Sequence, residues 1–291
     1  MNYKIAIASG KGGTGKTTVS VNLYKYLSEA LNNSVRLIDC DVEEPNDLLF
    51  FNNAIQLNQT TATQLIPHIN TDHCTFCGKC AEYCEFNAIS IIPSVKYAQV
   101  DASLCHSCGA CSVACQFDAI TEHEEAIGTI SEFETSFGKG LTAGNLSIGS
   151  SMQTMMISKT KASLSNDQQI TLFDSPPGTS CPVVETIADT DYVILVTEPT
   201  PFGLHDVQLM IELVHNLSKP FGLIINKAGL GNDELKKYIQ ANNIVLLGEI
   251  PFLKSYAASY STGNLLQNPP AEIDQEYRKI TSKILQNLNQ Q

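Results

Sequence analysis

The 291-residue sequence has few basic residues: 18 Lys and Arg stand against 30 Asp and Glu, a formal net charge of −12. Nonspecific DNA binding uses Lys and Arg to displace counterions, so this charge disfavours it and no nucleic-acid partner is expected. No apolar run approaches the roughly 20 residues needed to span a bilayer, so no membrane span is expected. Met1 leads directly into an apolar stretch that is typical of a strand, so no signal peptide is expected. The absence of Trp excludes nothing.

Eight of the ten cysteines form two copies of the spacing C-x₂-C-x₂-C-x₃-C, offset by 31 positions. The proline that usually follows the fourth cysteine is missing, since Glu85 and Gln116 stand there; this weakens a turn but leaves the sulfur atoms in place. In two-cluster ferredoxins, three cysteines of each run bind one [4Fe–4S] cluster and the fourth binds the other cluster. The expected ligands are Cys74, Cys77, Cys80 and Cys115 for cluster 1, and Cys105, Cys108, Cys111 and Cys84 for cluster 2.

Two other uses of these cysteines are less compatible with the sequence. Zinc sites favour paired C-x-x-C knuckles rather than this longer run. Disulfides belong to oxidising compartments, and no secretory signal is visible. Thiolate ligands require a reducing compartment, so a cytoplasmic location is predicted.

A glycine-rich loop, GKGGTGKT, occupies Gly10–Thr17, between an expected strand at Tyr3–Ser9 and an expected helix at Thr17–Leu31. This order of strand, loop and helix is typical of a phosphate-binding loop, in which backbone N–H groups surround a phosphate at the helix N-terminus. Lys16 is expected to neutralise phosphate charge, and Thr17 to offer its hydroxyl to Mg²⁺. The residues expected to hold ATP or ADP here are Gly10, Lys11, Gly12, Gly13, Thr14, Gly15, Lys16, Thr17 and Thr18.

An additional lysine near the start of this loop, Lys11, indicates which class of phosphate-binding ATPase the sequence resembles. The form K-G-G-T-G-K-T resembles the deviant Walker A motif of the MinD/ParA ATPases, whose relatives include Mrp-type iron–sulfur carriers and the iron protein of nitrogenase. The resemblance implies that Lys11 acts in catalysis together with Lys16, by reaching across an ATP-dependent dimer to the partner's nucleotide. That dimer would be a homodimer or a heterodimer with a related paralogue.

Further segments resemble the acidic motifs of the same family. A strand expected at Val35–Asp39 leads into DCDVEEPN, which is similar to switch I. The resemblance implies that Asp41 positions the attacking water and that Asp39 supports Mg²⁺. An apolar strand expected at Ile170–Asp174 ends in an acid, like a Walker B motif, and DSPPG resembles switch II. Thr17, Asp39 and Asp174 are therefore the expected Mg²⁺ ligands or neighbours of its ligands.

The adenine contacts are also implied by the resemblance. Asn226, in LIINK, matches the asparagine that reads adenine. Pro251 and Phe252, in GEIPF, fall in the usual place of a second adenine-contacting loop. The narrowest resemblance is to MinD-superfamily ATPases that carry an inserted ferredoxin domain.

The remaining pattern predicts an α/β fold. Apolar runs at 192–197, 221–226 and 244–250 do not alternate with polar residues, as expected for parallel strands buried on both faces. Helical patterns separate these runs, which favours the doubly wound, mostly parallel sheet of a P-loop NTPase, interrupted by a small inserted α+β domain that resembles bacterial ferredoxin. The expected domains are an N-terminal ATPase part at 1–66, the inserted 2×[4Fe–4S] domain at 67–126, and a C-terminal ATPase part at 127–291.

Two further cysteines and two histidines could have a structural or a functional role. Cys40 is expected to be small and half-buried. Cys181 matches a cluster-ligating switch II cysteine of the nitrogenase iron protein, but a buried structural cysteine before Pro182 is favoured. His73 and His106 could donate hydrogen bonds to sulfur, although solvated turn residues are favoured.

The last helical pattern, from Ile273 to Leu288, is amphipathic. A membrane-surface helix would be richer in basic residues. Packing of this helix on the sheet is therefore the prediction.

Three functions fit this organisation. The favoured one is an ATP-hydrolysing iron–sulfur protein, in which nucleotide-dependent dimerisation gates electron transfer by the two clusters to a redox partner. The second is an ATP-dependent assembly or carrier protein for iron–sulfur clusters or other metallocofactors, which acts on a client protein. The third, a MinD/ParA-like positioning ATPase, needs a membrane or DNA surface that an acidic chain does not favour.

Overall fold

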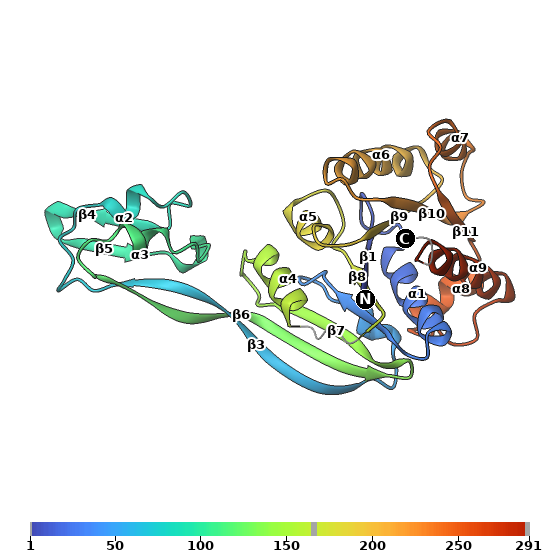
Figure 1. Cartoon of the computed structure of the whole chain (residues 1–291), viewed down its shortest axis with the longest axis horizontal. Helices are drawn as coiled ribbons and strands as arrows, with labels where there is room; N and C mark the ends of the chain where they lie inside the picture. The colour runs from blue at the N-terminus through green and yellow to red at the C-terminus, as the bar shows by residue number, and fades with distance from the viewer. Residues whose placement is uncertain (1, 164–167, 289–291) are drawn as a thin grey trace. The chain divides into compact units, whose positions relative to one another are not determined.

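The computed structural model describes residues 2–163 and 168–288. This described part forms a nine-stranded, mostly parallel sheet in the order β11-β10-β9-β1-β8-β2-β7-β6-β3 (Figure 1). The mostly parallel α/β sheet predicted from the apolar runs is confirmed. The strands are β1 (Tyr3–Ala8), β2 (Val35–Asp39), β3 (Ile55–Ile69), β6 (Ile120–Thr135), β7 (Gly138–Leu146), β8 (Ile170–Asp174), β9 (Tyr192–Thr197), β10 (Phe221–Ala228) and β11 (Leu246–Pro251).

Helices pack on both faces of this sheet. Ile5 and Ile7 of β1 belong to a core with α1 and α9, whereas Ala6 and Ala8 belong to a second core with α5, α6 and α7. Successive residues of a strand point to opposite faces, so β1 supplies both cores and must be apolar throughout. The helices are α1 (Lys16–Ala30), α4 (Gln153–Ala162), α5 (Cys181–Ile187), α6 (Pro201–Asn216), α7 (Glu234–Ala241), α8 (Lys254–Ser261) and α9 (Ala271–Leu288).

The C-terminal helix α9 packs against the sheet, as predicted. Ile273, Tyr277, Ile280 and Ile284 are buried in the core that also contains β1 and α1. Among residues 2–163 and 168–288, no helix has the length and apolar character needed to cross a membrane.

The register of the central strands places three motifs at one edge of the sheet. Ile7, near the end of β1, pairs with Asp174 of β8. Asp174 also pairs with Asp39, the last residue of β2. The carboxyl ends of these strands therefore bring the loop after β1 next to both acids, where open α/β sheets bind ligands.

The chain divides into two compact units: Met1–Thr60, Ile130–Asn145 and Ile157–Gln291 in the first, and Thr61–Thr129 with Leu146–Met156 in the second. The second unit is wider than the expected insertion at 67–126 and includes a short segment after β7. The reason is that β3 and β6 each run continuously from one unit into the other.

The second unit repeats its local backbone at the same 31-residue offset as its sequence. Positive φ angles occur in the pairs Phe76 and Ser107, Gly78 and Gly109, and Asn87 and Asp118. A short helix follows each glycine, and two antiparallel strands separate the repeats. These elements are α2 (Lys79–Glu82), β4 (Ile89–Ile92), β5 (Tyr97–Val100) and α3 (Ala110–Ala114), with the 3₁₀ turns η2 (Pro93–Val95) and η3 (Ala102–Leu104).

Candidate nucleotide site and cysteine sites

The glycine-rich loop joins β1 to the N-terminus of α1, as its sequence predicts. Gly13 and Gly15 have φ angles of 80° and 89°, which only glycine adopts readily. A Cβ atom on Gly15 would also collide with the side-chain amide of Asn226. The loop therefore needs glycine for both its curvature and the close approach of β10.

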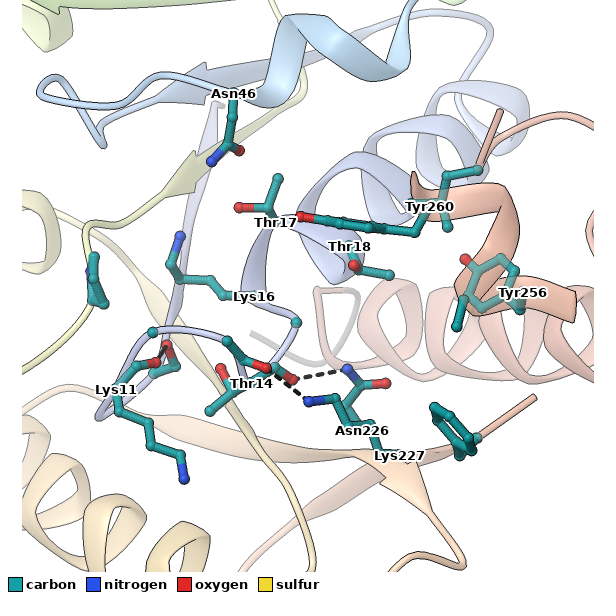
Figure 2. Close-up of a pocket in the computed structure, with 18 of the residues that line it drawn as sticks. Lys11, Thr14, Lys16, Thr17, Thr18, Asn46, Asn226, Lys227, Tyr256 and Tyr260 are labelled. Carbon is teal, nitrogen blue, oxygen red and sulfur yellow. Dashed lines mark hydrogen bonds between the residues drawn. The ribbon is translucent and has the colours of Figure 1, made fainter. Parts of the chain in front are cut away.

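A cavity of about 490 Å³ opens beside this loop (Figure 2). Most of the residues predicted to bind nucleotide line it, while Gly10 packs instead against the backbone of Asp206 in α6. The lining residues predicted from the sequence are Lys11, Gly12, Gly13, Thr14, Gly15, Lys16, Thr17, Thr18, Asp41, Asn226, Pro251 and Phe252. The lining also includes residues that sequence reasoning missed, among them Asn46, Lys227, Tyr256 and Tyr260.

Asp174 lies directly beneath the start of α1. Its carboxylate accepts hydrogen bonds from Lys16 Nζ at 2.9 Å, Thr17 Oγ1 at 2.9 Å and Ser20 Oγ at 2.7 Å. Burial alone would lower the pKa of Lys16, but Asp174 raises it, so the ammonium remains charged. In this state Lys16, which lines the cavity, pairs with Asp174 at the end of β8.

Asp39 is buried and is held by backbone groups of the segment that follows it. Its carboxylate accepts N–H hydrogen bonds from Asp41 at 3.0 Å, Asn46 at 2.8 Å and Asp47 at 3.0 Å. Burial, reinforced by the negative charge of Asp174, raises the pKa of Asp39 to about 7. Asp41 lines the cavity, and burial raises its pKa too. The segment after Asp41 is thus folded back over Asp39.

Asp47 was not predicted from the sequence, although it joins the same acidic group. Asp39, Asp47 and Asp174 each offer one carboxylate oxygen, and these three oxygens lie within 4.8 Å of one another. Burial raises the pKa of Asp47 well above its ordinary range, and the charges of Asp39 and Asp174 raise it further. Asp47 opens the 3₁₀ turn η1 (Asp47–Phe50), eight residues beyond Asp39.

Lys11 is held within its own chain. Its Nζ lies 3.0 Å from Glu198 and 3.8 Å from Asp206, and 5.9 Å from the centre of the exposed Phe202 ring. Burial alone would raise the pKa of Glu198, but hydrogen bonds from Lys11 and Lys227 lower it. Figure 2 shows the Lys11 side chain extending away from Lys16 and Thr17.

The three expected adenine contacts, Asn226, Pro251 and Phe252, line the cavity. Asn226 donates to Thr14 O at 2.8 Å, and Lys227 donates to Gly13 O at 2.8 Å and pairs with Glu198 at 3.1 Å (Figure 2). Asn226 therefore supports the phosphate-binding loop in addition to lining the cavity. Tyr256 and Tyr260 of α8 add aromatic surface beside Phe252. Their i, i+4 spacing was the available sequence signal, since it places both on one side of a helix.

The eight repeat cysteines line two small cavities of the second unit. One cavity contains Cys74, Cys77, Cys80 and Cys115, and the other contains Cys105, Cys108, Cys111 and Cys84. Each cavity therefore combines three cysteines of one run with the fourth cysteine of the other, which is the crossed arrangement of two-cluster ferredoxins.

The surroundings of these sulfur atoms fit a [4Fe–4S] cluster. Both cavities have mainly apolar walls, which include Ile69 in one and Ala88 in the other. Backbone N–H groups of Phe76 and Ala88 donate to the sulfur atoms of Cys74 and Cys84, each at 3.3 Å. Such N–H···S contacts and apolar burial are the features by which a protein adjusts a cluster.

Two predictions for the other cysteines need correction. Cys181 is exposed at the N-terminus of α5, so the favoured interpretation as a buried structural cysteine is wrong. The apolar face of α5 instead presents Val183 and Ile187 to the core. Cys40 is fully buried rather than half-buried, because it lies between strand β2 and the folded-back segment after it.

The two histidines near the repeat cysteines are exposed, as predicted. The His106 ring stacks on Phe86, with ring centroids 3.9 Å apart.

Comparisons with known proteins agree with this geometry. A model of the CobQ/CobB/MinD/ParA nucleotide binding domain matches residues 5–266. Two uncharacterised proteins of Methanocaldococcus jannaschii are 33% and 35% identical over 78% and 79% of this chain, and over 81% and 79% of their own lengths. An iron–sulfur cluster carrier protein of Methanococcus maripaludis is 21% identical over 100% of this chain and 87% of its own length.

Solved structures show the same fold. The septum site-determining protein MinD of Pyrococcus horikoshii, complexed with Mg-ADP, matches with a TM-score of 0.60 at 19% identity, over 98% of this chain and 96% of that chain. The cell division ATPase MinD of Pyrococcus furiosus matches with a TM-score of 0.61 at 17% identity, over 99% of this chain and 100% of that chain.

Proposed function

The chain belongs to the CobQ/CobB/MinD/ParA family of nucleotide-binding proteins, and from this premise we propose that it couples ATP binding and hydrolysis to electron transfer through two [4Fe–4S] clusters. The observation that carries the proposal is the grouping of the cysteines. Two cavities, each lined by four cysteines in the crossed pattern, occur in one chain with a phosphate-binding loop. Clusters bound there would supply one-electron transfer.

The nucleotide site supplies the groups that phosphoryl transfer needs. Backbone N–H groups of the loop would hold the phosphates, and Lys16 would pair with the phosphate charge instead of with Asp174. The Thr17 hydroxyl would hold Mg²⁺, and Asp39 and Asp174 would hold the groups around this ion, which would neutralise phosphate charge. Asp41 orients the attacking water. Lys11 completes the site in a second protomer, whether that is another copy of this chain or a related paralogue.

The proposed coupling between the nucleotide site and the cysteine sites depends on where the second unit is inserted in the chain. The unit is inserted after the switch I segment and before β8, which carries Asp174. The chain passes between the units at four points, within β3, β6, β7 and α4, and none of these points is in a loop. A change of switch I around the γ-phosphate would therefore reach the second unit along elements of regular structure.

A redox titration tests this proposal. We expect the midpoint potential of the clusters, or the rate of electron delivery to an artificial acceptor, to differ between ATP, ADP and no nucleotide. A ligand shifts an equilibrium only by its differential affinity for the two states, so Asp41→Ala with ATP should keep the ATP-like value. Identical redox behaviour in all three conditions would contradict the coupling.

A second function, cluster assembly or transfer, has two observations in its favour. The chain resembles an iron–sulfur cluster carrier protein along its whole length, and Cys181 is exposed beside switch II. Transfer of a cluster to an apo-ferredoxin, abolished by Cys181→Ser but not by Cys40→Ala, would favour this function over electron transfer. Failure of the wild-type protein to transfer a cluster would remove it.

A further inference from the structure

Asp47 is a buried acid without a hydrogen-bond donor. Its side chain is 0% exposed, and among the described residues neither carboxylate oxygen has a donor within hydrogen-bond distance. Its nearest polar neighbours are the carboxyl groups of Asp39 and Asp174, so a hydrogen bond between Asp47 and Asp174 requires that one of these two groups carry a proton. Burying a polar group without a partner is costly, so such a residue calls for an explanation.

The neighbouring acids differ from Asp47 in this respect. Asp39 accepts three backbone N–H hydrogen bonds, and Asp174 accepts hydrogen bonds from Lys16, Thr17 and Ser20. The buried ammonium of Lys16 thus faces three buried carboxyl groups. One ammonium can balance only one ionised carboxylate, and the raised pKa values of Asp39 and Asp47 are consistent with protons on the other acids in this state.

Lys16 is shared between the acidic group and the cavity, because it pairs with Asp174 and also lines the cavity. Its Nζ lies 2.9 Å from Asp174, and a phosphate bound by the loop would attract this ammonium toward the cavity. That movement leaves three carboxyl groups beside the Thr17 hydroxyl. Oxygen atoms from carboxylates and a hydroxyl are the ligands that hard divalent cations prefer.

We infer that Asp47 is a positioning residue for the divalent cation: with Asp39 and Asp174 it forms a carboxylate wall that holds Mg²⁺, directly or through water, once Lys16 turns to the phosphate. In the nucleotide-free chain the Lys16 ammonium takes the place of this cation beside Asp174. The inference rests on the proposed nucleotide site and adds Asp47 to its cation-binding groups. The unsatisfied buried carboxyl is then a group kept for the cation.

The test measures Mn²⁺ binding by electron paramagnetic resonance of the free ion, with ADP present. Asp47→Asn keeps the size of the side chain but removes its charge, and should weaken Mn²⁺ binding about 10–100-fold, as the loss of a supporting group does at other metal sites. Binding of ADP without metal should stay unchanged. Unchanged Mn²⁺ affinity in Asp47→Asn would overturn the inference and leave the proposed function intact, whereas absence of Mn²⁺–ADP binding in the wild-type protein would overturn both.

A second variant tests the exchange between lysine and cation. Lys16→Ala removes the internal ammonium, so it should bind Mn²⁺ without nucleotide more tightly than the wild-type protein does. Adding Asp47→Asn to Lys16→Ala should abolish that gain. If Lys16→Ala gains no Mn²⁺ affinity, or if the double variant keeps the gain, Asp47 does not hold the cation.

Thermal unfolding separates this role from a purely structural one. The amide introduced by Asp47→Asn can donate to the neighbouring carboxylates, so this variant should raise the melting temperature of the nucleotide-free protein, by about 2–4 °C for a gain near 1 kcal/mol. Asp189 is the matched control, because it pairs with Lys4 and Lys161. Asp189→Asn should lower the melting temperature and leave Mn²⁺ binding unchanged. A lower melting temperature with normal Mn²⁺ binding in Asp47→Asn would assign Asp47 a structural role instead.

Discussion

Release of Lys11 from Glu198 should limit ATP-dependent dimerisation. The proposed task of Lys11 is to contact the nucleotide of a second protomer, yet its Nζ lies 3.0 Å from Glu198 of its own chain. Each protomer must break this ion pair before the lysine can act in trans. Glu198→Gln keeps the shape of the side chain and removes its charge, so we expect the variant to dimerise more tightly with ATP.

The structure sets the size of this effect. The Lys11 and Glu198 side chains are 34% and 16% exposed, so solvent screens part of the attraction. Ion pairs of this kind contribute about 0.2–1 kcal/mol each. A dimer breaks two of them, so the dissociation constant should fall roughly 2–30-fold.

Sedimentation of the protein with ATP, in an Asp41→Ala background that slows hydrolysis, measures the dissociation constant directly. Glu212→Gln is the control, because Glu212 is an exposed glutamate of the same helix, α6, that carries Asp206. ADP affinity should be compared as well, since Glu198 also pairs with Lys227, which supports the loop at Gly13. Equal or weaker dimerisation of Glu198→Gln, with normal ADP affinity, would refute the reasoning.

Two further predictions separate the nucleotide site from the cysteine sites. Lys16→Ala should abolish ATP turnover but keep the iron content, because Lys16 and the repeat cysteines lie in different units; normal turnover would reject the assignment of the loop. Cys74→Ser with Cys115→Ser should reduce about eight iron atoms per chain to about four, because both residues line one cavity. Cys105→Ser with Cys115→Ser should damage both clusters, and the reverse result would contradict the crossed ligand sets.

Much of the fold could be predicted because its signals are local. The run Tyr192–Thr197 is apolar at nearly every position, and such a run is compatible with a strand covered on both faces. The glycine-rich loop needs glycine at positions of positive φ, so its conformation can be read from its spacing. The crossed grouping of the cysteines is also predictable from local spacing, because the turns of the cysteine repeat recur at a fixed offset.

The residues missed by sequence reasoning act through tertiary contacts. Asp47 joins Asp174 across more than one hundred residues, and Glu198 meets Lys11 from the end of β9; neither stands in a motif that marks its role. Cys181 was misassigned because a cysteine before proline in an apolar stretch favours burial on average. The helix α5 turns that position toward solvent because Val183 and Ile187 occupy the core-facing positions.

The short turn η1 lies in the first unit, on the path of the chain from the acidic group to strand β3. It begins at Asp47, in the acidic group, and ends at Phe50, whose ring lies 5.2 Å from that of Tyr260, a residue of the nucleotide cavity. Strand β3 starts at Ile55 and runs on to Ile69 in the second unit. A cation held by Asp47 would act on the first residue of this four-residue turn. A nucleotide that contacts Tyr260 would act, through Phe50, on its last residue. Because the turn connects to β3 through only a few residues, the ATP-dependent signal that we propose has a continuous covalent route toward the cysteine sites.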